Sequence, residues 1–465
     1  MNTNNIKKYA PIARREFIEA VGKRLNQFGV YNKGNTLTIS EPTVSGSVMQ
    51  IDGNAFDAGL APARKRLTIR AEQLGFDALV EHVAYTWFNR LCAIRFMELK
   101  PDYLEHGFRV LSPSPSQGEG RGVGIIPEIL DHAQYVAEAL GLERNHIVEL
   151  KLAGNKDEAL YRELLLGQCH QLHQAMPFLF EALDDETELL LPDNLTRTDS
   201  ILRGLVDGIP EEDWEQVEII GWLYQFYISE KKDQVIGKVV KSEDIPAATQ
   251  LFTPNWIVKY LVQNSVGRQW LMTYPDSGLK AQMDYYITPA EQEAAVGVAL
   301  AAITPTSIEP ETIKVIDPAC GSGHILVEAY NLLKAIYEER SYRSRDIPKL
   351  ILENNLYGLD IDDRAAQLAG FALMMKARED DRRIFTRDIK LNVLALVEGL
   401  GFRGEGLAGC YLEDLWAALD LEGVRKRGEN LDLFDVVAHR SLNFFKVRKI
   451  VAEYFHLPPW KHQYT

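Results

Sequence analysis

Residues 314–330 read KVIDPACGSGHILVEAY, and this stretch constrains the fold more than any other in the chain. A short β-rich run ends at Asp317 and Pro318, and an amphipathic helical pattern begins a few residues later. Gly321 and Gly323 lie between them and allow a tight turn whose backbone passes close to a ligand. The start of the helix adds free N–H groups. The sequence therefore predicts a nucleotide-type cradle at the carboxyl end of a first parallel strand.

The residues around the turn favour one class of nucleotide over others. A dinucleotide fingerprint needs a third glycine where this chain has Leu326, and the Walker lysine is missing, which argues against NAD and ATP. The acid directly before the loop suits a ligand with an amino group, and S-adenosylmethionine has one. We therefore expect S-adenosylmethionine as the cofactor, with Cys320 filling space behind it. The expected loop contacts are Asp317, Pro318, Ala319, Gly321, Ser322 and Gly323.

A second strand, turn and helix follow in residues 354–375, NNLYGLDIDDRAAQLAGFALMM. Asp360 falls at the end of this strand, where an acid can accept hydrogen bonds from ribose hydroxyls. It lies 43 residues after Asp317, a long interval that an extended first helix and a polar connection account for. Asp362 and Asp363 fit the N-cap and first turn of the next helix.

Composition limits the class of protein. No apolar stretch approaches the roughly 18 residues of a membrane span, and the N-terminus lacks the apolar core of a secretory signal, so we expect a soluble, cytoplasmic protein. Four scattered cysteines exclude a disulfide framework and a CxxC metal knuckle. The net charge of −15 leaves room only for local nucleic-acid contacts. The candidate basic stretches contain Arg14, Arg15, Lys23, Arg24, Arg64, Lys65, Arg66 and Arg70, which are more simply solvated helix faces.

The chain divides into four regions. Residues 1–110 are predicted to form a helical N-terminal domain, 111–124 a flexible Ser/Pro/Gly linker or insertion, and 125–244 a second helical region. From 311 onward strand and helix signals alternate, which predicts an open, mostly parallel α/β sheet. The fold class is therefore α/β, a helical N-terminal region followed by a partial Rossmann-like domain in residues 245–465.

Three motifs together resemble the adenine-N6 DNA methyltransferases: DPACGSG (317–323), YGLDID (357–362) and, upstream of both, QLFTPNWIVKYLV (250–262). In that family a Phe-Thr-Pro segment packs over the methionine end of S-adenosylmethionine, which here implies Phe252, Thr253 and Pro254. Two N-terminal stretches, KKYAPIARREFIEAVGKR (7–24) and YTWFNRLCAIRFMEL (85–99), are similar to the large methyltransferases of bacteriophage-exclusion (BREX) systems, the PglX family.

The resemblance implies a site-specific enzyme that transfers a methyl group to adenine N6 in double-stranded DNA, as self-marking in phage defence. It also implies other proteins of the defence system as partners. It implies neither membrane association nor a bound metal. Two alternatives stay open. One is an S-adenosylmethionine-binding remnant or scaffold subunit without turnover, and the other is a methyltransferase acting on protein or small molecules.

The family's base-positioning motif is not found in these 465 residues. It consists of Asn or Asp, two prolines and an aromatic, whose oxygens hold the amino group of the flipped adenine. In LFDVVAHRSLNFF (433–445), His439 and Arg440 stand where Asn-Pro is needed, and in HLPPWKHQ (456–463) Leu457 cannot accept a hydrogen bond. No catalytic residue is therefore assigned, and the chain is expected to be a truncated or frame-disrupted member.

Three further constellations are weaker. Glu98 and Lys100 have a nuclease-like Glu-x-Lys spacing but end a helical pattern, so coincidence is favoured. His170 and His173 share a helix face without further metal ligands in view. The third strand is expected within residues 385–397. The family resemblance implies an acid near this strand that reaches the adenine ring of the cofactor, and Asp388 is the nearest candidate.

Overall fold

The structure, a computed structural model, describes residues 2–34, 36–114, 126–180, 186–237, 240 and 244–396. Most of the expected linker and the two stretches weighed for the base-positioning motif, 433–445 and 456–463, lie outside the described residues. Within these residues no helix is both long and apolar enough to cross a membrane.

The N-terminal region is built on three helices, α1 (Thr3–Gln27), α2 (Ala61–Leu74) and α3 (Phe76–Glu98). Helix α3 is apolar round its whole circumference, and it is buried along most of its length, as the sequence predicts. Residues 30–57 also form five short strands that the sequence did not lead us to expect, because runs of three or four residues carry too little alternation. They are β1 (Val30–Lys33) paired antiparallel with β2 (Thr36–Ile39), and the antiparallel series β3 (Thr43–Ser45), β4 (Val48–Ile51) and β5 (Asn54–Asp57).

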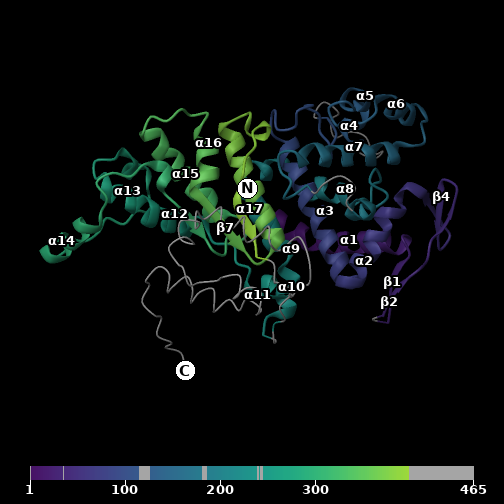
Figure 1. The fold of residues 1–465 in the computed structure, drawn as a ribbon, viewed down its shortest axis with the longest axis horizontal. Helices are drawn as coiled ribbons and strands as arrows, with labels where there is room; N and C mark the ends of the chain where they lie inside the picture. Colours follow the sequence, from purple (N-terminus) through teal and green to yellow (C-terminus); the bar gives the residue numbers. More distant parts are fainter. Residues whose placement is uncertain are drawn as a thin grey trace, which may run out of the picture.

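The next region is helical, in line with its sequence pattern. Its helices are α4 (Glu128–Asp131), α5 (Ala133–Val136), α6 (Arg144–Leu152), α7 (Asp157–His173), α8 (Ile201–Gly208), α9 (Ile219–Tyr227), α10 (Ser229–Val235) and α11 (Ile245–Thr249). Helix α9 packs against α1 on one side and against the sheet region on the other, through α17 (Asp363–Asp380). Figure 1 places α9 between these two parts of the molecule.

The sheet region confirms the predicted α/β, Rossmann-like class. Parallel strands β6 (Val315–Asp317), β7 (Leu356–Asp360) and β8 (Asn392–Ala395) lie in the order β6-β7-β8, and Asp317 is paired with Gly358. Read from β8, this is the 3-2-1 half of a doubly wound sheet. The helices of this region are α12 (Asn255–Val262), α13 (Arg268–Thr273), α14 (Ala294–Ile303), α15 (His324–Glu339), α16 (Ile347–Leu350) and α17.

One hydrophobic core joins the helical and sheet regions. Helix α17 packs against β7, β8 and α15 on the sheet side, and against α3 and α9 of the helical region. Phe96 and Phe371 meet edge to face with ring centroids 6.0 Å apart. A Cβ at Gly370 would lie 2.8 Å from the ring of Phe178, so the glycine permits this close approach. The strand ends that carry the predicted site are therefore supported from the helical region.

Candidate cofactor site

The glycine loop follows β6 as predicted, and its two glycines serve different purposes. Gly323 has φ +82°, and a Cβ there would lie 2.9 Å from the Cα of Ala369 on α17, so this position requires close packing. Gly321 has φ +54°, and a Cβ there would meet nothing within 4 Å, which leaves its backbone open on one side. Cys320 is buried, and a Cβ at Gly358 would lie 3.1 Å from its Sγ, which agrees with the space-filling role expected for the thiol.

Asp317 is a buried carboxylate with one oxygen left over. Its Oδ1 accepts a hydrogen bond from the N–H of Ala319 at 3.2 Å, while Oδ2 is buried without a partner among the described residues. Burial raises the pKa of Asp317, and the charge of Asp360 raises it further. A buried oxygen without a hydrogen bond is costly, so this atom fits a donor supplied by a ligand. The amino group of S-adenosylmethionine is such a donor.

Asp360 lies at the carboxyl end of β7, next to the loop. Its Oδ2 accepts from the N–H of Gly321 at 2.8 Å, and its Oδ1 accepts from the N–H of Asp362 at 2.9 Å. Burial raises the pKa of Asp360 as well. Each carboxylate oxygen has a second lone pair, so the side chain can still accept from ligand hydroxyls while it holds the loop. The structure thus brings Asp317, Asp360 and Gly321 together, as expected.

The Phe-Thr-Pro segment lies beside the loop, but its phenylalanine faces the protein interior. The Phe252 ring stacks on His324, with centroids 4.5 Å apart and planes 2° from parallel, and its other neighbour is Trp222 at 4.5 Å. The N–H of Phe252 donates to Oε1 of Gln225 on α9 at 2.9 Å. Phe252 therefore anchors the segment, which leaves half-buried Thr253 and exposed Pro254 as its parts nearest to solvent.

The remaining loop residues divide by exposure. Pro318 and Ala319 are exposed, whereas Ser322 is buried. Phe252, Ser322 and His324 line a cavity of about 310 Å³, together with side chains of α15, of α17 and of residues 215–221. Asp317, Gly321 and Asp360 are not among the residues that line this cavity, so we do not assign the cofactor to it.

The other candidates have structural partners. Glu98 is fully buried, pairs with Arg95 at 2.6 Å and accepts from the N–H groups of Val110 and Leu111, both at 2.7 Å, so the Glu-x-Lys spacing is coincidental. His170 lies 2.5 Å from Glu188, and no cluster of three or more metal-binding side chains occurs in the described part of the chain. The third strand is β8, as expected, but Asp388 precedes it. That places Asp388 at the edge of the sheet away from the loop, and it is not an adenine contact.

The two basic stretches are largely neutralised within the fold. Their pairs are Arg14 with Glu81 (2.9 Å), Arg15 with Glu230, Arg24 with Asp193 (2.7 Å) and Arg70 with Glu186 (3.0 Å), while Arg64 donates to backbone carbonyls of Phe28 and Ser40. Phosphate contacts need cations that are free to meet DNA. The arginines with acidic partners are therefore held within the fold, and these stretches give no positive support for a DNA-binding stripe.

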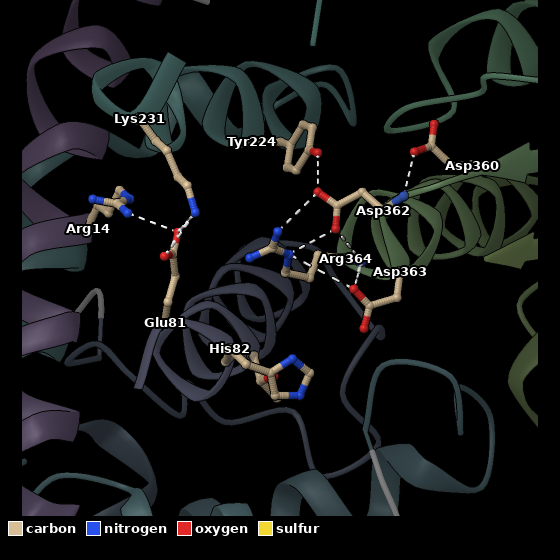
Figure 2. A network of polar contacts seen from close by, with 10 residues as sticks. Arg14, Glu81, His82, Tyr224, Lys231, Asp360, Asp362, Asp363 and Arg364 are labelled. Carbon is tan, nitrogen blue, oxygen red and sulfur yellow. Dashed lines mark hydrogen bonds and ion pairs between the residues drawn. The ribbon is translucent and has the colours of Figure 1, made fainter. Parts of the chain in front are cut away.

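The sequence did not reveal a polar network that ties the site to the helical region (Figure 2). The hydroxyl of Tyr224 on α9 donates to Oδ2 of Asp362 at 2.6 Å, and Arg364 Nε donates to Oδ1 of Asp362 at 2.8 Å. The Arg364 guanidinium also lies over the Tyr85 ring, 4.8 Å from its centroid. The only sequence signal for this role of α9 is a glycine, Gly221, inside an aromatic-rich helical pattern.

Comparison with known proteins agrees with this geometry. Residues 306–396 match the family model of the DNA-methyltransferase domain of MmeI. The chain is 64% identical over 437 residues to the adenine-specific methyltransferase BrxX of Escherichia coli O9:H4 (strain HS), covering 93% of this chain and 35% of that protein. It is 37% identical over 422 residues to the adenine-specific methyltransferase PglX of Lacticaseibacillus casei (strain Zhang), covering 84% and 34%. The chain therefore spans about a third of the length of these curated relatives. By sequence, the chain is similar to these adenine-specific methyltransferases over most of its own length.

Proposed function

We propose that this chain provides the S-adenosylmethionine-binding part of a DNA adenine-N6 methyltransferase that acts in BREX-type phage defence. The observation that carries the proposal is the buried Oδ2 of Asp317, which has no partner in the part of the chain that the structure describes and lies near the open backbone of Gly321. The names of the relatives, both adenine-specific methyltransferases, support the type of reaction. Double-stranded DNA is the proposed substrate, other defence proteins are proposed partners, and the proposed location is the cytoplasm.

In this proposal each residue of the site has one task. The cofactor supplies a methyl group that is activated on a sulfonium. Asp317 accepts hydrogen bonds from its amino group, and the backbone from Gly321 to Gly323 lines its methionine portion. Asp360 accepts from the ribose hydroxyls, as acids at this strand end do in related folds. Thr253 closes the methionine end, held in place by the anchored ring of Phe252.

A second candidate is cofactor binding without turnover, as in a scaffold subunit. The observation that favours it is the sequence itself, since no Asn-Pro-Pro-aromatic motif occurs in the 465 residues. Adenine N6 is a poor nucleophile, and the family holds it with oxygen acceptors after flipping the base. Without such acceptors this chain alone would bind the cofactor and leave DNA unmethylated.

Two measurements on the full chain separate these functions. Isothermal titration calorimetry with S-adenosylmethionine tests binding, and transfer of a tritiated methyl group to unmethylated DNA tests turnover. Asp317→Asn should weaken binding about tenfold or more, because a hydrogen bond to a charged group contributes about 1.5–3 kcal/mol. Asp388→Asn, at the far edge of the sheet, is the matched control and should bind as the unaltered chain does.

The outcomes are distinct. Binding with transfer to DNA supports the enzyme, and binding without transfer supports the scaffold. Transfer to protein or small molecules but not to DNA would indicate a different methyltransferase. Heat with a pyrophosphate nucleotide and none with S-adenosylmethionine would overturn the assignment of the loop.

A further inference from the structure

We propose that helix α9 is a positioning element of the cofactor site: Tyr224 holds the turn that follows Asp360, and Gln225 with Gly221 holds the Phe252 segment. This inference rests on the proposed function, because it concerns how the same cofactor would be held. Helix α9 belongs to the helical region, and none of its residues lies in the strand–loop–helix motifs that identify the family by sequence.

The first contact acts on the ribose side of the site. Asp362 follows Asp360 by two residues, and its N–H donates to Oδ1 of Asp360 at 2.9 Å. The Asp362 side chain is almost fully buried and caps α17 by accepting from the N–H of Arg364 at 3.2 Å. Tyr224 donates to the other oxygen of this carboxylate from α9. Tyr224 and Arg364 therefore fix the peptide that orients the Asp360 carboxylate.

The second contact acts on the methionine side. A Cβ at Gly221 would lie 2.1 Å from the Phe252 ring, so the ring can reach α9 only because this residue is glycine. One turn further on, Gln225 accepts from the N–H of Phe252. On its other face the ring stacks on His324, which is the first residue of α15 after the glycine loop. Contacts of Phe252 with α9 and with the residue after the glycine loop thus fix the position of the neighbouring Thr253.

Both contacts are made by helix α9, and they hold segments on the two sides of the glycine loop. Tyr224 and Gln225 are adjacent in sequence, so they point to different sides of α9, one toward the turn after β7 and the other toward the Phe252 segment. A displacement of α9 would move Asp360 and Thr253 together. The helical region is in this sense part of the proposed cofactor site, through the residues that α9 holds.

The test pairs a protein change with a ligand change, so that loss of stability alone does not mimic the effect. S-adenosylhomocysteine and its 2′,3′-dideoxyribose analogue are titrated calorimetrically into the full chain. The unaltered chain should prefer the ribose form about tenfold or more, because the hydroxyls bond to a carboxylate. Tyr224→Phe should reduce this preference to about threefold or less, since Asp360 is no longer held in place. Tyr227→Phe is the matched control and should retain the full preference, because the buried Tyr227 hydroxyl has no hydrogen-bond partner among the described residues.

Gln225 supplies an independent arm of the test. Gln225→Met removes the acceptor for the Phe252 N–H and should weaken both ligands by the same factor, about two- to tenfold, so the ribose preference stays unchanged. Gln225→Glu retains an acceptor oxygen at the same place and should restore most of the affinity.

The possible failures can be told apart. If the unaltered chain prefers the ribose form and Tyr224→Phe keeps that preference, the positioning role of Tyr224 is refuted and the proposed function stands. If Gln225→Glu binds as poorly as Gln225→Met, the role of Gln225 is refuted. If the unaltered chain binds neither ligand, the proposed function fails, and the positioning role fails with it.

Discussion

The two glycines of the loop should respond differently to the same substitution, and this difference tests how the loop works. At Gly323, alanine meets two penalties. The left-handed φ of +82° costs about 1–2 kcal/mol for a residue with a Cβ. The Cβ would also lie 2.9 Å from the Cα and Cβ of Ala369, and such overpacking costs about 1–3 kcal/mol. Gly323→Ala should therefore lower the free energy of unfolding by about 2–5 kcal/mol.

At Gly321 only the first penalty applies. Its φ is +54°, and a Cβ would meet nothing within 4 Å, so Gly321→Ala should cost about 1–2 kcal/mol of stability. The new methyl group would project into the open side of the loop, where the cofactor is proposed to lie. Its main effect should therefore be on binding, with the affinity for S-adenosylmethionine falling about tenfold or more, a loss typical of 1.4 kcal/mol or above.

Urea unfolding followed by tryptophan fluorescence measures the first effect, and calorimetric titration measures the second. The two variants control for each other, since they place the same methyl group two residues apart. The loop geometry would be refuted if Gly321→Ala were the more destabilised variant. It would also be refuted if Gly321→Ala bound S-adenosylmethionine as tightly as the unaltered chain does.

Three other expectations follow from the charged groups. Burial raises the pKa of Asp317 and Asp360, so the folded state keeps their protons at a pH where the unfolded chain has lost them. The contribution of these two groups to stability therefore declines as the pH rises from the ordinary carboxyl pKa through the raised pKa. Asp317→Asn should flatten this decline in thermal unfolding measured without ligand across that pH range. Affinity for S-adenosylmethionine should fall as pH is lowered through the raised pKa, since protons compete with the amino group, and calorimetry at several pH values measures this. Glu98→Gln should lower the free energy of unfolding by about 3 kcal/mol in urea, because it removes the buried carboxylate beside Arg95 and leaves that guanidinium with the longer ion pair to Glu211 at 3.4 Å.

The parts of the site that sequence predicted correctly are those with a local signal. A strand that ends in an acid and is followed by closely spaced glycines can be recognised within ten residues, and the structure has β6, the loop and α15 there. The same holds for Asp362, which was expected to cap the next helix and does so by accepting from the N–H of Arg364. Strand β8 was placed correctly, but Asp388 was taken from the wrong end of it, because a pattern places a strand more reliably than it places its ends.

The contacts that sequence did not predict are those between distant residues. Tyr224 and Asp362 are 138 positions apart, and nothing in the spacing of either one indicates the other. The Phe252 ring packs between His324 and Trp222, and the local sequence around Phe252 indicates neither neighbour. Aromatic side chains bury large areas, so a well-formed interior slot outweighs an exposed position near a ligand. Gly221 leaves the space that the Phe252 ring occupies, and only the folded structure shows that these two residues are neighbours.

The strand order explains why support from the helical region matters here. In a doubly wound sheet the ligand lies at the point where the order reverses, which is the outer edge of the first strand. That first strand is β6, which among the described strands pairs only with β7. Ile316 on this strand is 50% exposed. Within this part of the chain, the proposed cofactor residues have a sheet neighbour on one side, where α17 packs against β7 and Tyr224 of α9 holds the turn after it. A site supported from one side depends strongly on those contacts. This is why loss of the single Tyr224 hydroxyl, which bonds to Asp362 and not to Asp360 itself, should be measurable in the affinity for the ribose.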